Sequence, residues 1–249
     1  MAKTKRITAL LLTLVMIVCI IPFSVFADEP PANGWYEDKS GGDSYWYYYV
    51  DGEPATGWKK IGKKWYYFYG DGQMASNEII QPDSESIPYY VDESGAMVTK
   101  VGWCKFTFSF DPDQNVYWVY VTKGGALARG WKKVGGKWYF LNSYYGIMSS
   151  NTVVSSDDKN FYIVGKDGVM STKKGWRNLN AYGMSLWFYA KKGGLLKLGW
   201  YQEKGNWYYF EKKHGGLMVF NTTAWQIGDK YYDFDENGVC TTPDGYIIT

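Results

Sequence analysis

Cysteine, proline and histidine are all scarce in this chain of 249 residues, which has three Cys, eight Pro and one His. Cys19 lies in an apolar N-terminal segment, so Cys104 and Cys240 are the two thiols of the remaining chain. Small secreted folds that depend on disulfides have more cysteines, usually at close spacing. The sequence therefore predicts a fold held together by packing rather than by cross-links.

Long apolar runs are lacking outside the N-terminal segment. That segment has a positive start, an apolar stretch over 9–23 and small residues up to Ala27, which is the order of parts in a secretory signal peptide. We expect residues 1–27 to be removed and 28–33 to form a short lead-in; an uncleaved anchor helix is the competing interpretation. No later run is long and apolar enough to span a bilayer.

An excess of charge of one sign is also lacking. Without the predicted leader, 24 Lys and Arg stand against 25 Asp and Glu, a net charge near −1. A nucleic-acid partner would need a basic field, so we expect none.

Side chains for catalysis or metal binding are few. His214, the single His, lies in the turn sequence EKKHGG, and neither a Ser–His–Asp nor a Cys–His arrangement can be assembled around it. Metal-ligand spacing is absent, and the carboxylates are scattered in turns, so a pair for glycoside hydrolysis cannot be argued. We expect no catalytic residue, no metal and no cofactor.

Aromatic residues, in contrast, make up 20% of the chain. The stretch from Gly57 to Met74 reads GWKKIGKKWYYFYGDGQM, and versions of it return at Gly130 and Gly199. Apolar residues come in runs of four or five bounded by Gly, Asp, Asn and Lys-Gly, which is typical of short strands joined by turns.

Alignment on the ring cluster and the following Gly-x-Met divides residues 34–249 into nine units. They start near Gly34, Gly57, Glu78, Gly102, Gly130, Asn151, Gly175, Gly199 and Asn221. Units three, six and nine lack the opening Gly-Trp, and units one, four and seven carry insertions, so the nine units form three triplets. Each unit is predicted to be one β-hairpin. A single hairpin is marginal in water, so stacking into an all-β hairpin-repeat solenoid is expected. Cys104 and Cys240 then lie too far apart to form an intramolecular disulfide, and we expect two free thiols or an intermolecular link.

The repeats resemble the cell-wall-binding repeats of the choline-binding proteins of Gram-positive bacteria. The resemblance covers residues 34–249; it is strong in the six Gly-Trp units and weak in the other three. It implies a left-handed solenoid in which choline on teichoic or lipoteichoic acid binds between consecutive hairpins, in a box of aromatic rings with a hydrophobic floor. Similar repeats also occur in glucan-binding enzymes and clostridial toxin tails, where the ligand is a carbohydrate.

Carrying that box over assigns three rings to each site: the opening Trp, the first aromatic of the ring-rich strand, and the third position of the next unit's ring-rich strand. The complete sets are Trp35, Tyr45 and Tyr67; Trp58, Trp65 and Tyr90; Trp103, Trp118 and Phe140; and Trp176, Trp187 and Tyr209. Two further sets lose the third ring, since Trp131 and Trp138 meet Ile163, and Trp200 and Trp207 meet Asp233. The expected floors are Met74, Met97, Leu127, Met148, Leu196 and Met218.

Sites that open on units three and six lack the first Trp and are expected to be empty. Rings on the opposite strand face are expected to be core: Tyr66, Phe68, Tyr139, Phe188 and Tyr208.

The resulting hypothesis is a secreted, non-catalytic protein held without covalent attachment on a choline-bearing cell surface, where it could be an adhesin or a regulator of wall hydrolases. The alternative is a secreted glucan-binding or other glycan-binding repeat protein that uses the same rings as stacking platforms.

Overall fold

A computed structural model describes residues 29–108, 111–181 and 183–248. The predicted leader, residues 1–27, lies outside this part of the chain. The described residues form β-strands, turns and one short 3-10 turn, η1 (Lys212–His214). The prediction of an all-β hairpin fold is therefore confirmed. Among the described residues, no helix is long and apolar enough to cross a membrane.

Nine separate antiparallel sheets follow one another along the described chain, each built on one hairpin. The hairpins are β1 (Gly34–Asp38) with β2 (Tyr45–Val50), β4 (Gly57–Ile61) with β5 (Lys64–Phe68), β6 (Glu78–Ile80) with β7 (Tyr89–Val91), β8 (Gly102–Phe106) with β9 (Tyr117–Val121), β10 (Gly130–Val134) with β11 (Lys137–Leu141), β12 (Thr152–Val154) with β13 (Tyr162–Val164), β14 (Gly175–Ala181) with β15 (Met184–Ala190), β16 (Gly199–Glu203) with β17 (Asn206–Glu211), and β19 (Thr222–Ile227) with β20 (Lys230–Phe234). Two sheets gain a short third strand, β3 (Glu53–Pro54) or β18 (Leu217–Met218).

Turn chemistry explains why the regular units close so tightly. In the β4–β5 hairpin the two residues between Ile61 and Lys64 are Gly62 and Lys63, and Gly62 has φ +60°. A positive φ at the first turn residue matches the right-handed twist of the flanking strands, and Gly adopts it without a Cβ clash.

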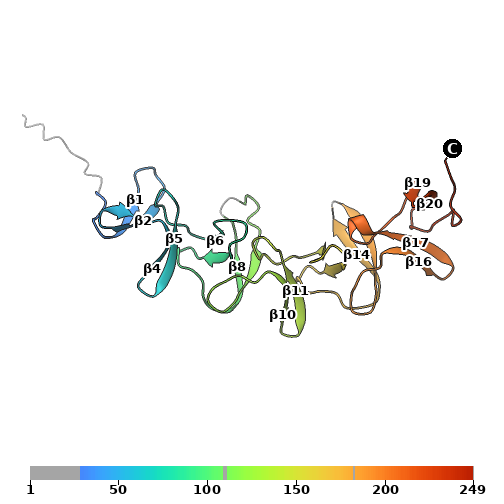
Figure 1. Ribbon diagram of the computed structural model, residues 1–249, viewed down its shortest axis with the longest axis horizontal. Helices are drawn as coiled ribbons and strands as arrows, with labels where there is room; N and C mark the ends of the chain where they lie inside the picture. The colour runs from blue at the N-terminus through green and yellow to red at the C-terminus, as the bar shows by residue number, and fades with distance from the viewer. Residues whose placement is uncertain (1–28, 109–110, 182, 249) are drawn as a thin grey trace, which may run out of the picture.

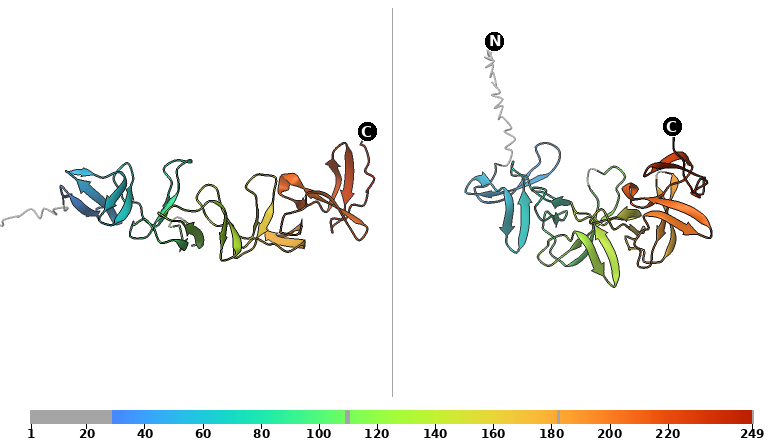
Figure 2. Two further views of the ribbon diagram at one scale, coloured as in Figure 1. Left: turned by 60° about the horizontal axis from the view of Figure 1, so that its bottom comes forward. Right: turned by 45° about the vertical axis from the view of Figure 1, so that its right-hand side comes forward.

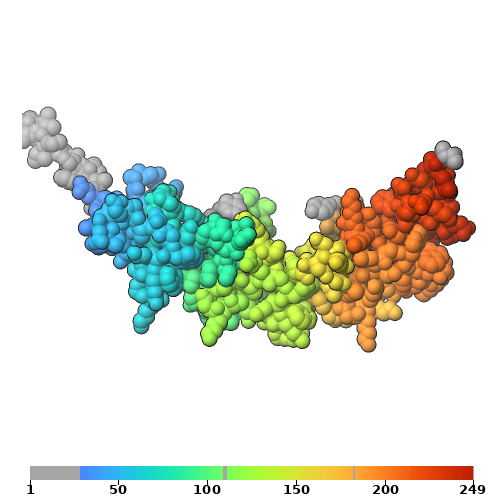
Figure 3. Space-filling model, in the orientation of Figure 1, coloured from blue at the N-terminus to red at the C-terminus, as the bar shows by residue number. Residues whose placement is uncertain are grey.

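The hairpins are strung along one elongated, gently curved body (Figure 1). Figure 2 shows from two further directions that the first and last hairpins lie at opposite ends. In the space-filling view, hairpin tips project from the lower edge of the body (Figure 3).

Backbone hydrogen bonds tie repeating hairpins to the ones before them. In most units, the residue after the closing turn donates its N–H to a carbonyl on or next to the ring-rich strand of the preceding unit. The bond from Met74 to Trp46 is 2.7 Å long, and that from Met97 to Trp65 is 2.8 Å. Such buried links satisfy backbone groups that the two-stranded sheets leave unpaired.

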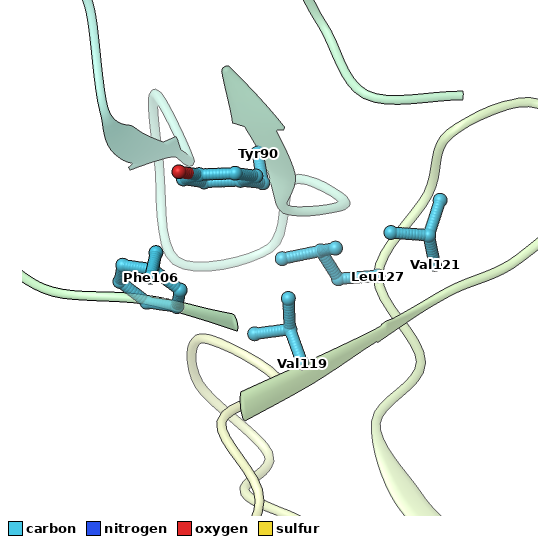
Figure 4. Packing of buried hydrophobic residues seen from close by; sticks show 5 residues of the cluster. All are labelled: Tyr90, Phe106, Val119, Val121 and Leu127. Atoms are coloured by element: carbon cyan, nitrogen blue, oxygen red, sulfur yellow. The ribbon is translucent and has the colours of Figure 1, made fainter. Parts of the chain in front are cut away.

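The hydrophobic core is divided into small clusters between hairpins. At the junction of units three and four, Tyr90, Phe106, Val119, Val121 and Leu127 form a closed cluster, each at most 5% exposed. Figure 4 shows Tyr90 of one hairpin lying over side chains that come from the next. The equivalent cluster between units six and seven contains Ile163, Leu179, Phe188, Ala190 and Leu196.

Cys104 and Cys240 are both free thiols, as the separation of their units predicts. Burial raises the pKa of each thiol. Neither cysteine contributes a cross-link to the fold.

Candidate ligand-binding boxes

Strand register places two Trp side chains on the same face of each regular hairpin. Trp58 pairs across the sheet with Tyr67, and Trp65 lies two residues from Tyr67 on the same strand. Because successive side chains alternate between faces, all three rings point to one side. The face that carries Tyr66 and Phe68 points to the preceding unit instead.

Six junctions bring together an opening Trp, a ring-strand Trp and a Tyr of the next unit. We name them boxes A to F in chain order: Trp35, Trp46 and Tyr66 (A); Trp58, Trp65 and Tyr89 (B); Trp103, Trp118 and Tyr139 (C); Trp131, Trp138 and Tyr162 (D); Trp176, Trp187 and Tyr208 (E); and Trp200, Trp207 and Tyr232 (F).

The ring geometry is nearly constant among the boxes. The opening Trp lies 4.8–5.5 Å from the Tyr of the next unit, with interplanar angles of 67–84°. In boxes A and C to F, the two Trp rings are 6.1–6.5 Å apart and close to perpendicular. The ring-strand Trp residues are 37–40% exposed, so each box keeps an open side. Perpendicular rings around an open space present several aromatic faces to one bound ligand.

The third ring differs from the prediction by one residue. The ring that meets the opening Trp from the next unit occupies the second position of the ring-rich strand, not the third. The predicted third-position rings Tyr67, Phe140 and Tyr209 instead pack against the opening Trp of their own units, at 5.1–5.3 Å. Tyr90 is buried in the closed cluster between units three and four. The cause is the way the hairpins stack. The face of one hairpin that carries its opening Trp packs against the face of the next hairpin that does not carry an opening Trp.

Several other expectations change with this shift. Tyr66, Tyr139 and Tyr208 were expected to be core but form box walls, whereas Phe68 and Phe188, at 0% and 3% exposed, are core as predicted.

In unit one the ring-strand member is Trp46 rather than Tyr45, because Trp46 pairs with Glu37 as Trp65 pairs with Lys60. Boxes D and F are complete as well. Tyr162 and Tyr232 supply the ring that the third-position residues Ile163 and Asp233 could not.

The box floors are mostly as predicted. Met74, Met97, Met148 and Met218 line the cavities of boxes A, B, C and E. Leu127 and Leu196 belong to the closed clusters instead, where buried hydrophobic side chains fill the place of a box. Sequence reasoning missed Met170 and Cys240, which donate their N–H groups to the Trp138 and Trp207 carbonyls, as Met74, Met97 and Met148 do in their own boxes. The equivalent backbone position after each turn was the signal that could have found them.

Four boxes open into cavities of two sizes. The cavities of boxes A and B measure about 380 and 370 Å³. Those of boxes C and E measure about 650 and 520 Å³, because the long hairpins of units four and seven add a wall. That wall contains Asn115 and Val116 in box C, and Met184 and Ser185 in box E.

A turn from a third unit presses closely on three of the Met floors. A Cβ on Gly95, Gly168 or Gly238 would lie 2.4–2.5 Å from the side chain of Met74, Met148 or Met218, respectively. These glycines have φ of +73° to +77°, a region that side-chain-bearing residues rarely adopt. Glycine therefore fixes the floor height, and the neighbouring turn residues form the outer rim.

Box E has an additional anchor for its opening Trp. The Glu203 carboxylate accepts hydrogen bonds from Trp176 Nε1 (2.8 Å) and the Tyr201 hydroxyl (3.0 Å). These bonds hold the pKa of Glu203 below its usual range. Burial, together with contacts to Tyr189 and Glu203, raises the pKa of Tyr201.

The chemistry of the boxes suits a weakly hydrated cation. Aromatic faces carry negative quadrupole potential and attract cations within about 6 Å of the ring centre. Box D shows this preference with the protein's own side chains, because Lys133 Nζ lies 5.8 Å from the Trp138 ring centre. The same flat, apolar ring faces can also stack on sugar rings.

Comparison with known proteins places repeat matches inside the described chain. A model of the choline-binding repeat matches residues 55–101, and a model of a cell wall binding repeat matches 130–143 and 199–213. These segments cover box B, the Tyr66 side of box A, and the hairpins that carry Trp131 and Trp200.

Curated relatives include two streptococcal enzymes. Glucosyltransferase-S of Streptococcus mutans is 26% identical over 85% of this chain, and Glucosyltransferase-I of Streptococcus downei is 26% identical over 81%. The chain spans only 15% and 13% of the lengths of these enzymes.

Solved structures of Streptococcus pneumoniae proteins also match. Choline binding protein F is 28% identical, with a TM-score of 0.41, over 80% of this chain and 62% of that one. The choline-binding domain of Spr1274 is 34% identical, with a TM-score of 0.24, over 28% of this chain and 98% of that domain.

Proposed function

The chain belongs to the family of proteins built from choline-binding repeats, and we propose that it binds choline substituents of a Gram-positive surface polymer in boxes A to F. Teichoic and lipoteichoic acids are the proposed polymers, and the proposed location is the cell surface, held without a covalent bond. One observation carries this proposal: two Trp rings and one Tyr ring meet at all six junctions that open on a Gly-Trp.

The energetics favour a quaternary ammonium in these boxes. Its methyl groups leave little hydration to lose, and each ring contact contributes roughly 0.5–2 kcal/mol, depending on how far it is desolvated. Three rings over a Met floor therefore give a weak individual site. Several sites on one chain raise the effective concentration for a polymer that carries many cholines, so overall binding becomes much tighter than one box allows.

The protein is proposed to be non-catalytic. The repeats themselves are a binding module, and the two glucosyltransferase relatives match over only a small share of their own lengths. His214 lies on the exposed turn η1 and contacts the Glu211 carboxylate. That pair is not combined with a nucleophile in any contact seen in the described residues.

A glucan ligand is the second candidate, favoured by the glucosyltransferase relatives and by the polar rims of boxes C and E. Sugar sites place hydrogen-bonding groups beside an aromatic platform, whereas a choline site needs rings on several sides of a cation. The perpendicular rings favour choline.

Calorimetry of the secreted chain tests the choice between the two ligands. Choline chloride should bind at several sites, while maltose and isomaltose oligosaccharides should give no heat. Trp65→Ala and Trp118→Ala should each remove one choline site. Tyr144→Ala is a matched control, because this exposed ring lies outside all six boxes. Heat from a sugar, lost in the Trp variants and absent with choline, would overturn the choline proposal in favour of the glucan.

A further inference from the structure

Charge is distributed unevenly along the elongated body. Residues 114–200 contain 13 Lys and Arg and three Asp, so their net charge is +10. Residues 28–113 contain 15 acidic and seven basic side chains, and residues 201–249 contain seven and four, which gives net charges of −8 and −3. The described part of 114–200 occupies the middle of the body, between these two acidic ends (Figure 1). A total charge near −1 therefore conceals a strongly basic centre.

The structure brings two pairs of exposed lysines together in this basic centre. One pair lies just before β14 and the other in the turn after β15: Lys173 and Lys174, and Lys191 and Lys192. The turn packs directly on the segment that carries the first pair, because the Gly193 N–H donates to the Thr172 carbonyl at 3.2 Å. A Cβ on Gly194 would lie 2.1 Å from the Ser171 carbonyl oxygen, so glycine permits this close approach.

Arg177 on β14 holds the first lysine pair in place. Its guanidinium donates hydrogen bonds to the backbone carbonyls of Lys173 and Lys174, and to Ser171 Oγ at 3.2 Å. These bonds fix the backbone of the segment and add a fifth positive charge beside it. We name the five residues the central basic cluster: Lys173, Lys174, Arg177, Lys191 and Lys192.

No carboxylate forms an ion pair with the central basic cluster among the described residues, where both ion pairs lie outside 114–200. The charge of Glu203 does reach the cluster. Hydrogen bonds from Trp176 and Tyr201 lower the pKa of Glu203, and Lys174 adds a smaller effect. Because that carboxylate already accepts these two bonds, it leaves the lysines free. Concentrating like charges destabilises a folded chain by repulsion, so an anionic partner is the simplest explanation for the cluster.

From this arrangement we infer that the central basic cluster binds the phosphodiester backbone of a flexible anionic polymer, and that it does so without choline. Lysine ammonium groups bind phosphates as compact point charges. A rigid nucleic-acid duplex or a flat anionic bilayer would also bring negative charge against the acidic ends of the body. A flexible chain with spaced phosphates can follow the basic centre alone. The inference goes beyond the proposed function, because it requires no aromatic box.

Titration of the secreted chain with poly(glycerol phosphate) that carries no choline tests the inference. Binding should weaken between about 50 and about 200 mM salt, because neutralised phosphates release counterions. Gln at all four lysines of the cluster should weaken binding at least about tenfold, whereas Arg at the same positions should preserve it. A matched control set removes four exposed charges elsewhere and should weaken binding less than about twofold, since distant charges are screened. That set is Lys63→Gln, Lys100→Gln, Lys204→Gln and Lys213→Gln.

Equal losses in the two Gln sets would overturn the inference, because total charge rather than the cluster would then determine binding. A similar loss in the Arg set would also overturn it, since charge is kept there. Saturating choline should leave polymer binding unchanged, and competition would assign the polymer to the boxes instead. Duplex DNA or anionic vesicles that bind as tightly as the polymer would refute the preference for a flexible chain. Choline binding, followed at the Trp138 indole, should survive in all three sets and tests the proposed function separately.

Discussion

Replacing adjacent rings on one strand tests how consecutive hairpins share a box. Tyr139 and Phe140 are neighbours on β11 and point to opposite faces. Tyr139 lies 4.8 Å from Trp103 of the preceding unit, whereas Phe140 lies 5.1 Å from Trp131 of its own unit. The same substitution, to Leu, keeps apolar bulk at either position and removes the aromatic face.

The expected effect of Tyr139→Leu is confined to box C. Loss of one of three ring contacts should cost about 1 kcal/mol of choline binding, or about fivefold in Kd. Loss of the edge-to-face pair with Trp103 should lower the free energy of unfolding by roughly 0.5–1.5 kcal/mol. Phe140→Leu should leave box C unchanged and perturb box D, with a similar loss of stability.

Site-resolved NMR of the indole N–H groups, with urea unfolding alongside, measures both quantities. The Trp118 signal follows choline binding at box C, and the Trp138 signal follows box D. If Phe140→Leu weakened the site that Trp118 reports while Tyr139→Leu left it intact, the assignment of rings to boxes would be wrong.

Three further outcomes are expected. Gly168→Ala should lower the free energy of unfolding by about 1–2 kcal/mol, because Gly168 has a positive φ, and it should weaken choline binding in box C by displacing Met148. Urea unfolding measures the first effect and choline titration the second. An unchanged protein would refute the assignment of Met148 as the floor. Glu203→Gln should lower Tm at pH 7. The Glu203 pKa is depressed below about 4.5, so its contribution is present above that pH and is lost as pH falls through the folded pKa; the difference in Tm from wild type should therefore shrink in acid, and a constant difference would contradict this linkage. Choline affinity should be nearly flat between pH 6 and pH 8, because the aromatic walls carry no group that titrates there, and a steep change in calorimetry would count against these boxes.

Much of the fold follows from local sequence. Gly-Trp, the two-residue Gly turns and the Gly-x-Met endings mark the regular hairpins, and strand alternation identifies Phe68 and Phe188 as core. The third and sixth units, which match the repeat pattern weakly, also show in their sequence why they form no box. Ile79 and Val153 stand where other units have an opening Trp, and they pack against the closed clusters.

The identity of the third ring could not be obtained in the same way. Alternation shows that Tyr66 and Tyr67 face opposite sides, but it does not show which side meets the preceding hairpin. That choice depends on the rotation between successive units, which is fixed partly by a long-range bond from the Met74 N–H to the Trp46 carbonyl. Nor could the sequence show that a turn two units away forms the rim of boxes A, B, C and E.

The order of junctions along the body determines how the number of boxes would change with the number of repeats. Two open junctions are followed by one that is filled with buried hydrophobic side chains; this order occurs twice, and two open junctions then end the series. Insertion of one more triplet would therefore add two open boxes and one sealed joint, without disturbing any contact inside the existing triplets. Valence and length would rise in fixed steps, with the sealed joints acting as spacers that set the distance between neighbouring pairs of boxes.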